Sequence, residues 1–420
     1  MPTNDQARTS ACRRDGGYSV DDHAPTADGR IRLHPGKDIT IRRGHPWVFE
    51  GAIAAVEGAP ISGDVVEVVD SAGAFVAWAF YSAHSQIRAR CVSYNAEAVP
   101  GEALLRQRLR HAWDLRLRLG FSASAGVRVV HAEGDMLPGL IIDLYDATAS
   151  IQFHHPWAER YREMICSFAL QELGARTAID RSQRAARARE GLPQSQGLIT
   201  DTYEEHPRIT EHGVVFEVDA RNGQKTGFYL DQRANRALMT RWASGRRVLD
   251  LYAHTGGFGL ACLAAGAEHV TFVESGAAAV DVLGENLALN GIAPARCSVV
   301  REEVERFLGA ASGGYDMVIM DPPPMARRKA HVSSALRGMV WQLAAIAKLA
   351  GSDTLLMAFS CSHHLGPKDL EGAIASAAVE SGRTVQVLRE LGADADHPSA
   401  AGHPEGRYLC GFLAHIGEAT

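Results

Sequence analysis

The sequence predicts an α/β protein in which a small β-barrel and a central α+β domain precede a doubly wound parallel sheet. Three changes of pattern along the chain support this prediction. Short β-type runs fill residues 30–98, a mixed pattern covers residues 101–215, and strands alternate with helices over residues 216–420. We therefore expect three domains with these boundaries.

The first part of the chain contains no long helical period. Residues 1–29 are polar and rich in glycine, aspartate and threonine, which predicts a disordered tail. The segments "IRLHPGKDITIRRGHPWVFEGAI" and "GDVVEVVDSAGAFVAWAFYSAHSQIRARCVS" then alternate β-type runs with glycine and aspartate turns. This alternation predicts the small barrel.

Residues 101–215 combine both kinds of pattern. "EALLRQRLRHAWDLRLRLG" has a helical period with an arginine-rich face, and "WAERYREMICSFALQELG" is also helical. "GLIIDLYDATASIQFHH" predicts a β-hairpin that turns around Asp146. These segments together indicate an α+β domain.

Five apolar runs define the predicted parallel sheet: "RRVLDLY", "HVTFVES", "CSVVRE", "YDMVIMD" and "TLLMAFS". Helical segments separate them, as crossover connections between parallel strands require. "TVQVLRELG" and "RYLCGFLAHIG" follow with no helix between them, so we expect this last pair to be antiparallel. Doubly wound sheets bind ligands at the carboxyl ends of their strands, and the motifs for cofactor and catalysis fall at such ends.

Composition excludes several classes of protein. The chain has 420 residues, 46% hydrophobic and 22% charged, which is typical of a soluble globular protein. It has no apolar run of roughly 18 residues and no apolar N-terminal stretch, so neither a membrane helix nor a secretory signal is predicted. Seven scattered cysteines indicate reduced thiols in the cytoplasm. The net charge of −6 confines nucleic-acid binding to local basic patches.

A glycine-rich turn follows the first strand of the expected sheet. In "VLDLYAHTGGFGLACLAAG", Asp250 lies in the strand, and Thr255, Gly256 and Gly257 form the turn before a helix. Glycine lets the backbone approach a ligand closely, and the helix start offers N–H groups. Glu274 ends the next strand, where a carboxylate can bind ribose hydroxyls. The turn fits the NAD fingerprint GxGxxG poorly, which favours S-adenosylmethionine over NAD.

Two side chains that could take part in catalysis follow the fourth and fifth strands. Asp321 lies in "MDPPP", where rigid prolines hold the backbone at the sheet edge. Taken alone, this is equally well an ordinary strand-terminating turn. Cys361 lies in "LLMAFSCSHH". Taken alone, it is more often a packing residue than a nucleophile, and no further ligand with zinc spacing follows the two histidines.

At these motifs the chain resembles the class I S-adenosylmethionine-dependent methyltransferases. It is most similar to the bacterial large-subunit ribosomal RNA cytosine-5 methyltransferases that carry an N-terminal PUA domain. The resemblance covers residues 30–417 and rests on these segments, in the same order: "HPGKDITIRRGHPWVFEGAI", "EHGVVFEVDARNGQKTGFYLDQRANR", "VLDLYAHTGGFGL", "VIMDPPP", "AFSCS" and "DADHPSAAGHPEGRYLCGF". It implies a Rossmann-like methyltransferase sheet, an RNA-binding PUA domain at residues 30–98, and a central domain that helps to hold RNA.

The resemblance also implies roles for single residues. It places Glu274 on the cofactor ribose and Glu303 near the adenine, where the family usually has aspartate. The segment "QKTGFYLDQR" lies over the pocket. The expected cofactor-binding residues are Lys225, Gly227, Tyr229, Asp250, Thr255, Gly256, Gly257, Glu274, Glu303 and Asp321. The chain departs from the family at Pro324, where lysine is usual, and at Met339 and Val340.

The resemblance changes the interpretation of Cys361. Carbon 5 of cytosine is a poor nucleophile, so its methylation needs prior addition at C6, which a thiolate performs well. In the family pattern Cys361 attacks C6, while Asp321 hydrogen-bonds the N3/N4 edge of the base and stabilises the adduct. A base inside a helix would first have to be extruded from its stack. Cys361 and Asp321 are therefore the expected catalytic residues, and no metal is expected.

Basic residues in two places are candidates for RNA contact. Arg327, Arg328 and Lys329 follow the Asp-Pro-Pro-Pro turn, and Arg42 and Arg43 lie in the expected PUA domain. A further segment, "RSQRAARAREG", spaces arginines 181, 184 and 187 as one helical face. That stripe contacts RNA phosphates in one interpretation and is a solvated surface in the other.

The sequence thus predicts a cytoplasmic enzyme that uses S-adenosylmethionine to form 5-methylcytosine in large-subunit ribosomal RNA. Two alternatives stay open. The first is an RNA base-nitrogen methyltransferase with a structural Cys361, and the second is a non-catalytic RNA-binding or assembly protein that kept the fold. Ribosomal RNA is the expected partner, no membrane is expected, and a second copy of the chain is a further candidate partner.

Overall fold

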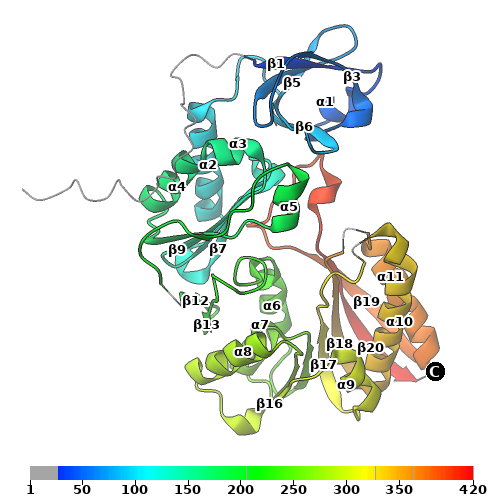
Figure 1. Cartoon of the computed structure of the whole chain (residues 1–420). Helices are drawn as coiled ribbons and strands as arrows, with labels where there is room; N and C mark the ends of the chain where they lie inside the picture. Colours follow the sequence, from blue (N-terminus) through cyan, green and yellow to red (C-terminus); the bar gives the residue numbers. More distant parts are fainter. Residues whose placement is uncertain (1–26, 205, 327, 363, 420) are drawn as a thin grey trace, which may run out of the picture. The chain divides into compact units, whose positions relative to one another are not determined.

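The computed structural model describes residues 27–204, 206–326, 328–362 and 364–419. Residues 1–26 of the predicted disordered tail lie outside the described residues. The chain divides into two compact units (Figure 1). The first runs to Ile209 and adds Val218–Phe228 and Ala395–Gly406, and the second comprises Thr210–Glu217, Tyr229–Asp394 and Arg407–Thr420.

The first unit begins with a six-stranded sheet of order β2-β6-β5-β4-β1-β3. Its elements are β1 (Gly29–Leu33), α1 (Ile39–Arg42), β2 (Trp47–Phe49), β3 (Ile53–Gly58), β4 (Val65–Val69), β5 (Phe75–Tyr81) and β6 (Ile87–Ser93). Successive side chains of a strand point to opposite faces. Val66 and Ala77 point to one face and belong to a buried cluster within this sheet. Phe80 points to the other face and stacks on Trp157, with ring centroids 5.1 Å apart.

The same unit contains a second sheet of order β11-β10-β9-β8-β7. Its strands are β7 (Val127–His131), β8 (Leu140–Tyr145), β9 (Thr148–Phe153), β10 (Thr177–Asp180) and β11 (Gly197–Leu198), and its helices are α2 (Glu102–Arg118), α3 (Pro156–Arg160), α4 (Arg162–Gln171) and α5 (Arg184–Arg189). The predicted hairpin around Asp146 is confirmed, and Asp146 has the left-handed φ of 51° that such a tight turn uses. The predicted helix over "WAERYREMICSFALQELG" is instead two helices that meet at Tyr161.

One apolar cluster joins the two sheets of the first unit. Val65, Trp78 and Phe80 of the six-stranded sheet share it with Val127 and Ile142 of the second sheet. Burial of a continuous apolar cluster is the main favourable term in folding. Residues 30–98 and 101–215, which the sequence separates by pattern, are therefore parts of one compact unit.

The second unit is built on a seven-stranded sheet of order β16-β15-β14-β17-β18-β20-β19 (Figure 1). Its strands are β14 (Arg247–Leu251), β15 (His269–Val273), β16 (Cys297–Val300), β17 (Tyr315–Met320), β18 (Ala350–Ser360), β19 (Arg383–Gly392) and β20 (Cys410–Ala419). The first five are parallel, and β20 pairs antiparallel with both β18 and β19. The predicted doubly wound sheet and its antiparallel last pair are confirmed.

Helices cover both faces of this sheet. They are α6 (Arg233–Thr240), α7 (Gly257–Ala264), α8 (Ala277–Leu289), α9 (Val304–Ala310), α10 (Val332–Leu349) and α11 (Pro367–Ser381), and a two-stranded sheet of β12 (Arg208–Glu211) and β13 (Val214–Glu217) precedes them. Leu249 and Leu251 of β14 belong to the same buried cluster as Met339 of α10 and Ile374 of α11. Asp250, between the two leucines, points to the opposite face. The strand order reverses between β14 and β17, which puts the switch point of the sheet at these two strands.

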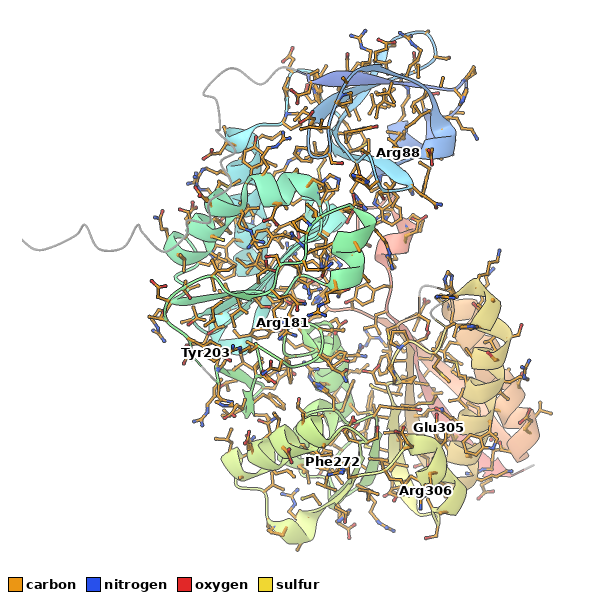
Figure 2. All side chains as sticks on the ribbon, in the orientation of Figure 1. Arg88, Arg181, Tyr203, Phe272, Glu305 and Arg306 are labelled. Carbon is orange, nitrogen blue, oxygen red and sulfur yellow. The ribbon has the colours of Figure 1, made fainter. Side chains whose placement is uncertain are left out.

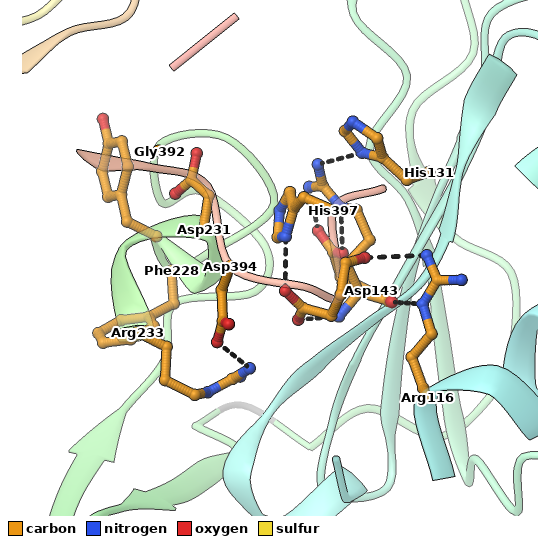
Figure 3. Close-up of polar contacts among 12 residues, drawn as sticks. Arg116, His131, Asp143, Phe228, Asp231, Arg233, Gly392, Asp394 and His397 are labelled. Atoms are coloured by element: carbon orange, nitrogen blue, oxygen red, sulfur yellow. Dashed lines mark hydrogen bonds and ion pairs between the residues drawn. The ribbon is translucent and has the colours of Figure 1, made fainter. Parts of the chain in front are cut away.

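Two segments expected in the C-terminal domain fold with the first unit, namely Val218–Phe228 and Ala395–Gly406. Asp396 accepts a hydrogen bond from the main-chain N–H of Arg128 at 3.0 Å, and its carbonyl accepts one from buried Arg116 at 2.9 Å (Figure 3). Thr226 hydrogen-bonds Tyr145 at 2.9 Å. Buried polar groups need such partners, and these partners belong to the first unit.

Candidate active site

The turn between β14 and α7 is closely packed. The Cβ of an alanine at Gly256, which has φ +87°, would lie 2.3 Å from Leu283, and at Gly259 it would lie 2.1 Å from Phe272. Only glycine fits such distances. Gly256 in the turn and Gly259 in α7 therefore allow close packing against α8 and β15.

Thr255 in this turn has an unsatisfied hydroxyl. Its side chain is buried, and among the described residues its Oγ1 has no hydrogen-bond partner. The main-chain carbonyl of Thr255 accepts a hydrogen bond from Asn286 at 3.0 Å, which fixes the turn. Buried hydroxyl groups are normally paired, so this Oγ1 suits a hydrogen bond to a bound cofactor.

Two carboxylates brace the same turn. Asp250 accepts a hydrogen bond from the Gly259 N–H at 2.9 Å and is almost fully buried. Burial raises the pKa of Asp250 to about 7, and the hydrogen bond from Gly259 opposes this shift. Glu274, half-buried at the end of β15, accepts from the N–H groups of His254 at 2.9 Å and Gly276 at 2.7 Å. Asp250 therefore holds the helix start, whereas Glu274 is at the accessible edge.

Glu303 follows the adjacent strand β16. It precedes the first residue of α9, and its side chain is exposed and forms no capping hydrogen bond with that helix. Since β16, β15 and β14 are neighbouring parallel strands, Glu303, Glu274 and Thr255 lie along the same edge of the sheet. The family resemblance assigns the adenine, ribose and turn contacts to these residues in this order, and those assignments stay predictions.

Asp321 and Cys361 follow the neighbouring strands β17 and β18. Met320 pairs with Ala358 in the parallel ladder, and the Cys361 thiol donates to the carbonyl of Pro322 at 3.6 Å. Cys361 is half-exposed, although Ser360 and Ser362 on either side are buried. By contrast, Cys262 and Cys410 are buried, and burial raises the pKa of both thiols. Cys361 thus differs from an ordinary packing cysteine.

Tyr229 also belongs to this region of the second unit. Its ring contacts the ring of His254 edge-on, with centroids 5.0 Å apart. Burial raises the pKa of its hydroxyl, and the charges of Asp321 and Cys361 add to the shift. Tyr229 therefore interacts electrostatically with both expected catalytic residues.

Lys225 and Gly227 belong to the first unit, within the segment Val218–Phe228. A Cβ at Gly227, which has φ +136°, would lie 2.6 Å from Val218, so this glycine is required by packing in its own segment. Arg181 donates to the carbonyls of Gly223 at 2.5 Å and Lys225 at 3.3 Å (Figure 2). The structure thus assigns these two residues and Tyr229 to different compact units.

The predicted basic residues differ in their surroundings. Arg42 forms ion pairs with Asp38 at 2.8 Å and Asp70 at 2.9 Å, and Arg43 is exposed. Arg328 and Lys329 are exposed just after the Asp-Pro-Pro-Pro turn, whereas Arg327 lies outside the described residues.

The predicted arginine stripe is wrong. The helix begins at Arg184, and Arg181 lies before it and bonds to main-chain carbonyls. Arg187 is fully buried, donates to the carbonyl of Phe153 at 2.8 Å and pairs with Glu159 at 2.8 Å. Helical spacing alone does not show which face is covered.

The sequence motifs did not reveal the side chain that holds Asp321, nor a buried ion pair of the helix α6 that follows it. Gln232, in the short helix Leu230–Gln232, donates from Nε2 to Asp321 Oδ2 at 3.0 Å. Arg236 makes a buried bidentate pair with Glu211, with both distances 2.6 Å. The only signal for these residues is their place in "LDQRANR".

Other features of the described residues bear on the class of site. They contain no group of three or more histidine, cysteine or acidic side chains arranged to hold a metal ion. None of their helices combines the length and apolar character that crossing a bilayer requires.

Two solved structures superpose on nearly the whole chain. One, proposed to be a methyltransferase and solved with S-adenosylhomocysteine (SAH), superposes with a TM-score of 0.79 and 18% identity, covering 92% of this chain and 99% of that one. Another, also proposed to be an S-adenosylmethionine-dependent methyltransferase, from Streptococcus mutans, has a TM-score of 0.77 and 18% identity and covers 92% and 100%. These likenesses confirm the predicted fold.

Sequence relatives are closer. The proteins named ribosomal RNA large subunit methyltransferase I of Yersinia pseudotuberculosis serotype O:1b (strain IP 31758) and Yersinia pestis bv. Antiqua (strain Angola) are each 36% identical over 396 residues, covering 92% of this chain and 99% of theirs. Residues 31–94 match the PUA-like domain family, and residues 186–402 match the S-adenosylmethionine-dependent methyltransferases. The chain belongs to the family of S-adenosylmethionine-dependent methyltransferases and carries a PUA-like domain ahead of its catalytic sheet.

Proposed function

We propose that this protein methylates carbon 5 of a cytosine in large-subunit ribosomal RNA. The observation that carries the proposal is the half-exposed Cys361 at the end of β18, with its thiol 3.6 Å from the carbonyl that follows Asp321. The names of the Yersinia relatives support ribosomal RNA as the substrate, and the PUA-like domain supports RNA binding.

The cofactor site fits S-adenosylmethionine. The unpaired hydroxyl of Thr255 and the carboxylates of Glu274 and Glu303 would hold it, with Gly256 and Gly257 allowing close approach of the backbone. Bound S-adenosylmethionine supplies an electrophilic methyl group. Three further residues are proposed to contribute to cofactor binding. Lys225 and Gly227 belong to the first unit, and Tyr229 belongs to the second.

The proposed mechanism uses Cys361 and Asp321. The Cys361 thiolate forms a bond to C6 of the base, which makes C5 nucleophilic enough to be methylated. Asp321 accepts a hydrogen bond from the N4 amino group at this edge of the base and holds the ring against Cys361 while the adduct forms. Loss of the C5 proton to a base then expels the thiolate and restores the ring. Arg43, Arg328 and Lys329 are proposed to contact RNA phosphates.

The proposal also covers the organisation of the chain. Residues 30–98 would bind RNA as the PUA-like domain, residues 101–215 would help to hold it, and residues 216–420 would carry the chemistry, apart from the two segments that fold with the first unit. An enzyme acting on ribosomal RNA is expected in the cytoplasm.

The test measures transfer of tritium from labelled S-adenosylmethionine to ribosomal RNA from cells that lack the protein, followed by nucleoside analysis. Wild type should yield 5-methylcytosine, and Cys361→Ala should lose at least about 1,000-fold in rate. Cys297→Ala is the matched control, because Cys297 is also half-exposed but lies in strand β16. An active Cys361→Ala variant would indicate a base-nitrogen target. No transfer by wild type, despite SAH binding, would favour the non-catalytic alternative.

A further inference from the structure

A pair of buried amides connects Asp321 to a main-chain carbonyl. Gln232 donates from Nε2 to Asp321 Oδ2 at 3.0 Å, and its Oε1 accepts from Asn235 Nδ2 at 2.6 Å. The same Nδ2 donates to the carbonyl of Gly392 at 2.9 Å. Gln232 and Asn235 are 1% and 4% exposed, so water competes little for these bonds.

The carbonyl of Gly392 fixes the direction of every bond in this chain. A carbonyl only accepts hydrogen bonds, so the Asn235 atom beside it has to be the amide nitrogen. That nitrogen also meets Gln232, so the Gln232 atom facing it has to be the oxygen. The amide nitrogen of Gln232 is then directed at Asp321. Asp321 Oδ2 must therefore accept a hydrogen bond, and an N–H donor on a carboxylate favours its ionised form.

The segment that carries Gln232 is rigidly held. Asp231 accepts from the hydroxyl of Tyr408 at 2.5 Å, and its carbonyl accepts from the N–H of Asp394 at 2.9 Å. Arg233 pairs with Asp394 at 3.5 Å (Figure 3). Arg236 donates to the Tyr229 carbonyl at 2.9 Å. These contacts leave the Gln232 amide little freedom to move away from Asp321.

We propose that Gln232 and Asn235 are positioning residues that keep Asp321 an ionised acceptor and thereby select a base with an amino group. This inference rests on the proposed function. Cytosine presents the N4 amino group as a donor at this edge, whereas uracil presents the O4 oxygen, an acceptor. A carboxylate fixed as an acceptor binds the former and repels the latter.

Other ionisable groups act on Asp321 as well. Tyr229, Arg236 and Asp250 interact with it electrostatically, and Cys361 interacts with Tyr229. The test therefore leaves all of these groups in place and alters the amide chain at position 235.

The decisive variant is Asn235→Asp. Aspartate has nearly the same shape as asparagine, but a carboxylate oxygen takes the place of the Nδ2 donor. With a carboxylate at position 235, the Gln232 amide turns its nitrogen toward that position and its oxygen toward Asp321. We expect kcat to fall about 100-fold while the KM for S-adenosylmethionine changes less than about twofold. The acid limb of the pH–rate profile should move to higher pH, because Asp321 now loses a stabilising N–H donor. The ratio of cytosine to uracil methylation should fall.

Two comparison variants separate positioning from packing. Asn235→Ala leaves Gln232 able to donate to Asp321, so it should lose less activity than Asn235→Asp; a packing role predicts the opposite order. Asn290→Asp is the matched control, because Asn290 Nδ2 also donates to two carbonyls, those of Val215 at 2.7 Å and Asn286 at 2.8 Å. It should keep the pH–rate profile of wild type.

A readout independent of turnover is the 13C NMR titration of the Asp321 carboxyl, assigned with Asp321→Asn. In Asn235→Asp this carboxyl should take up its proton at higher pH than in wild type and in Asn290→Asp. Equal titration in all three proteins would overturn the inference. Absence of 5-methylcytosine from wild type would refute the proposed function instead, and the titration would still test the amide pair.

Discussion

The two halves of the carboxyl edge of the seven-stranded sheet hold their carboxylates differently. At the ends of β14 and β15, Asp250 and Glu274 accept hydrogen bonds from main-chain N–H groups at most 20 residues away in the sequence. Beyond β17, Asp321 accepts one from the side chain of Gln232, 89 residues away. The half assigned to the cofactor is thus ordered by its own loops, whereas the half assigned to the base depends on a distant segment.

The largest expected effect tests the distant segment. Arg236→Met leaves Glu211 buried without its bidentate partner and with Arg233 at the longer distance of 3.6 Å, so we expect a loss of about 3–5 kcal/mol in the free energy of unfolding, measured with urea. The double variant Arg236→Met/Glu211→Leu should recover much of it. Arg306→Met, which removes an exposed ion pair on α9, should unfold near wild type. A loss of less than 1 kcal/mol for Arg236→Met would show that this framework is dispensable.

The second prediction uses the buried carboxylate of the cofactor half. Asp250 has its pKa raised to about 7, against about 3.9 in an unfolded chain. The folded state thus binds the proton more tightly than the unfolded state, and this difference stabilises the fold. The stabilisation is fully present below about pH 4 and is lost as the pH rises through about 7. It amounts to about 4 kcal/mol at most. Asp250→Asn should abolish it.

The measurement is the difference in unfolding free energy between wild type and Asp250→Asn, from urea titrations at several pH values. Asparagine can still accept the hydrogen bond from Gly259. The difference should change steadily between pH 4 and pH 7 and stay constant above about pH 8. A difference that does not depend on pH would contradict the raised pKa.

Packing of the glycine turn gives the third prediction. Gly259→Ala would place a Cβ 2.1 Å from Phe272, and we expect it to lower the free energy of unfolding by about 1–3 kcal/mol and to weaken SAH binding. Gly284→Ala on α8, where the new Cβ meets no atom within 4 Å, should instead stabilise the protein slightly. Thermal unfolding and calorimetric SAH titration measure both effects. Unchanged stability of Gly259→Ala would show that α7 can shift.

The smallest expected effect concerns Glu274. In Glu274→Gln one of the two acceptors becomes a donor and faces a main-chain N–H group, so the turn is less well held and a ribose acceptor is lost. We expect SAH to bind about tenfold more weakly, with the 13C titration of Asp321 unchanged. Glu371→Gln, on the exposed face of α11, is the control. A shifted Asp321 titration in Glu274→Gln would show that the two halves are coupled.

Much of the fold followed from sequence pattern. The hairpin at Asp146, the parallel strands and the antiparallel last pair all involve neighbouring segments with a clear period. The failures share a different origin. Helical spacing put Arg187 on a solvent face, but β9 and Glu159 cover it. Periodicity within a segment contains no information about what another segment covers.

The sequence alone determined which residues end the strands of the catalytic sheet. In a parallel sheet the carboxyl ends share one edge, so strand order along the chain brings Thr255, Glu274, Asp321 and Cys361 to that edge whatever the side-chain packing. Only the tertiary structure decided that Gln232 holds Asp321, and that Val218–Phe228 and Ala395–Gly406 fold with the first unit. These contacts join segments that are far apart in the sequence. They form because buried polar groups need hydrogen-bond partners, and only the packed structure brings those partners together.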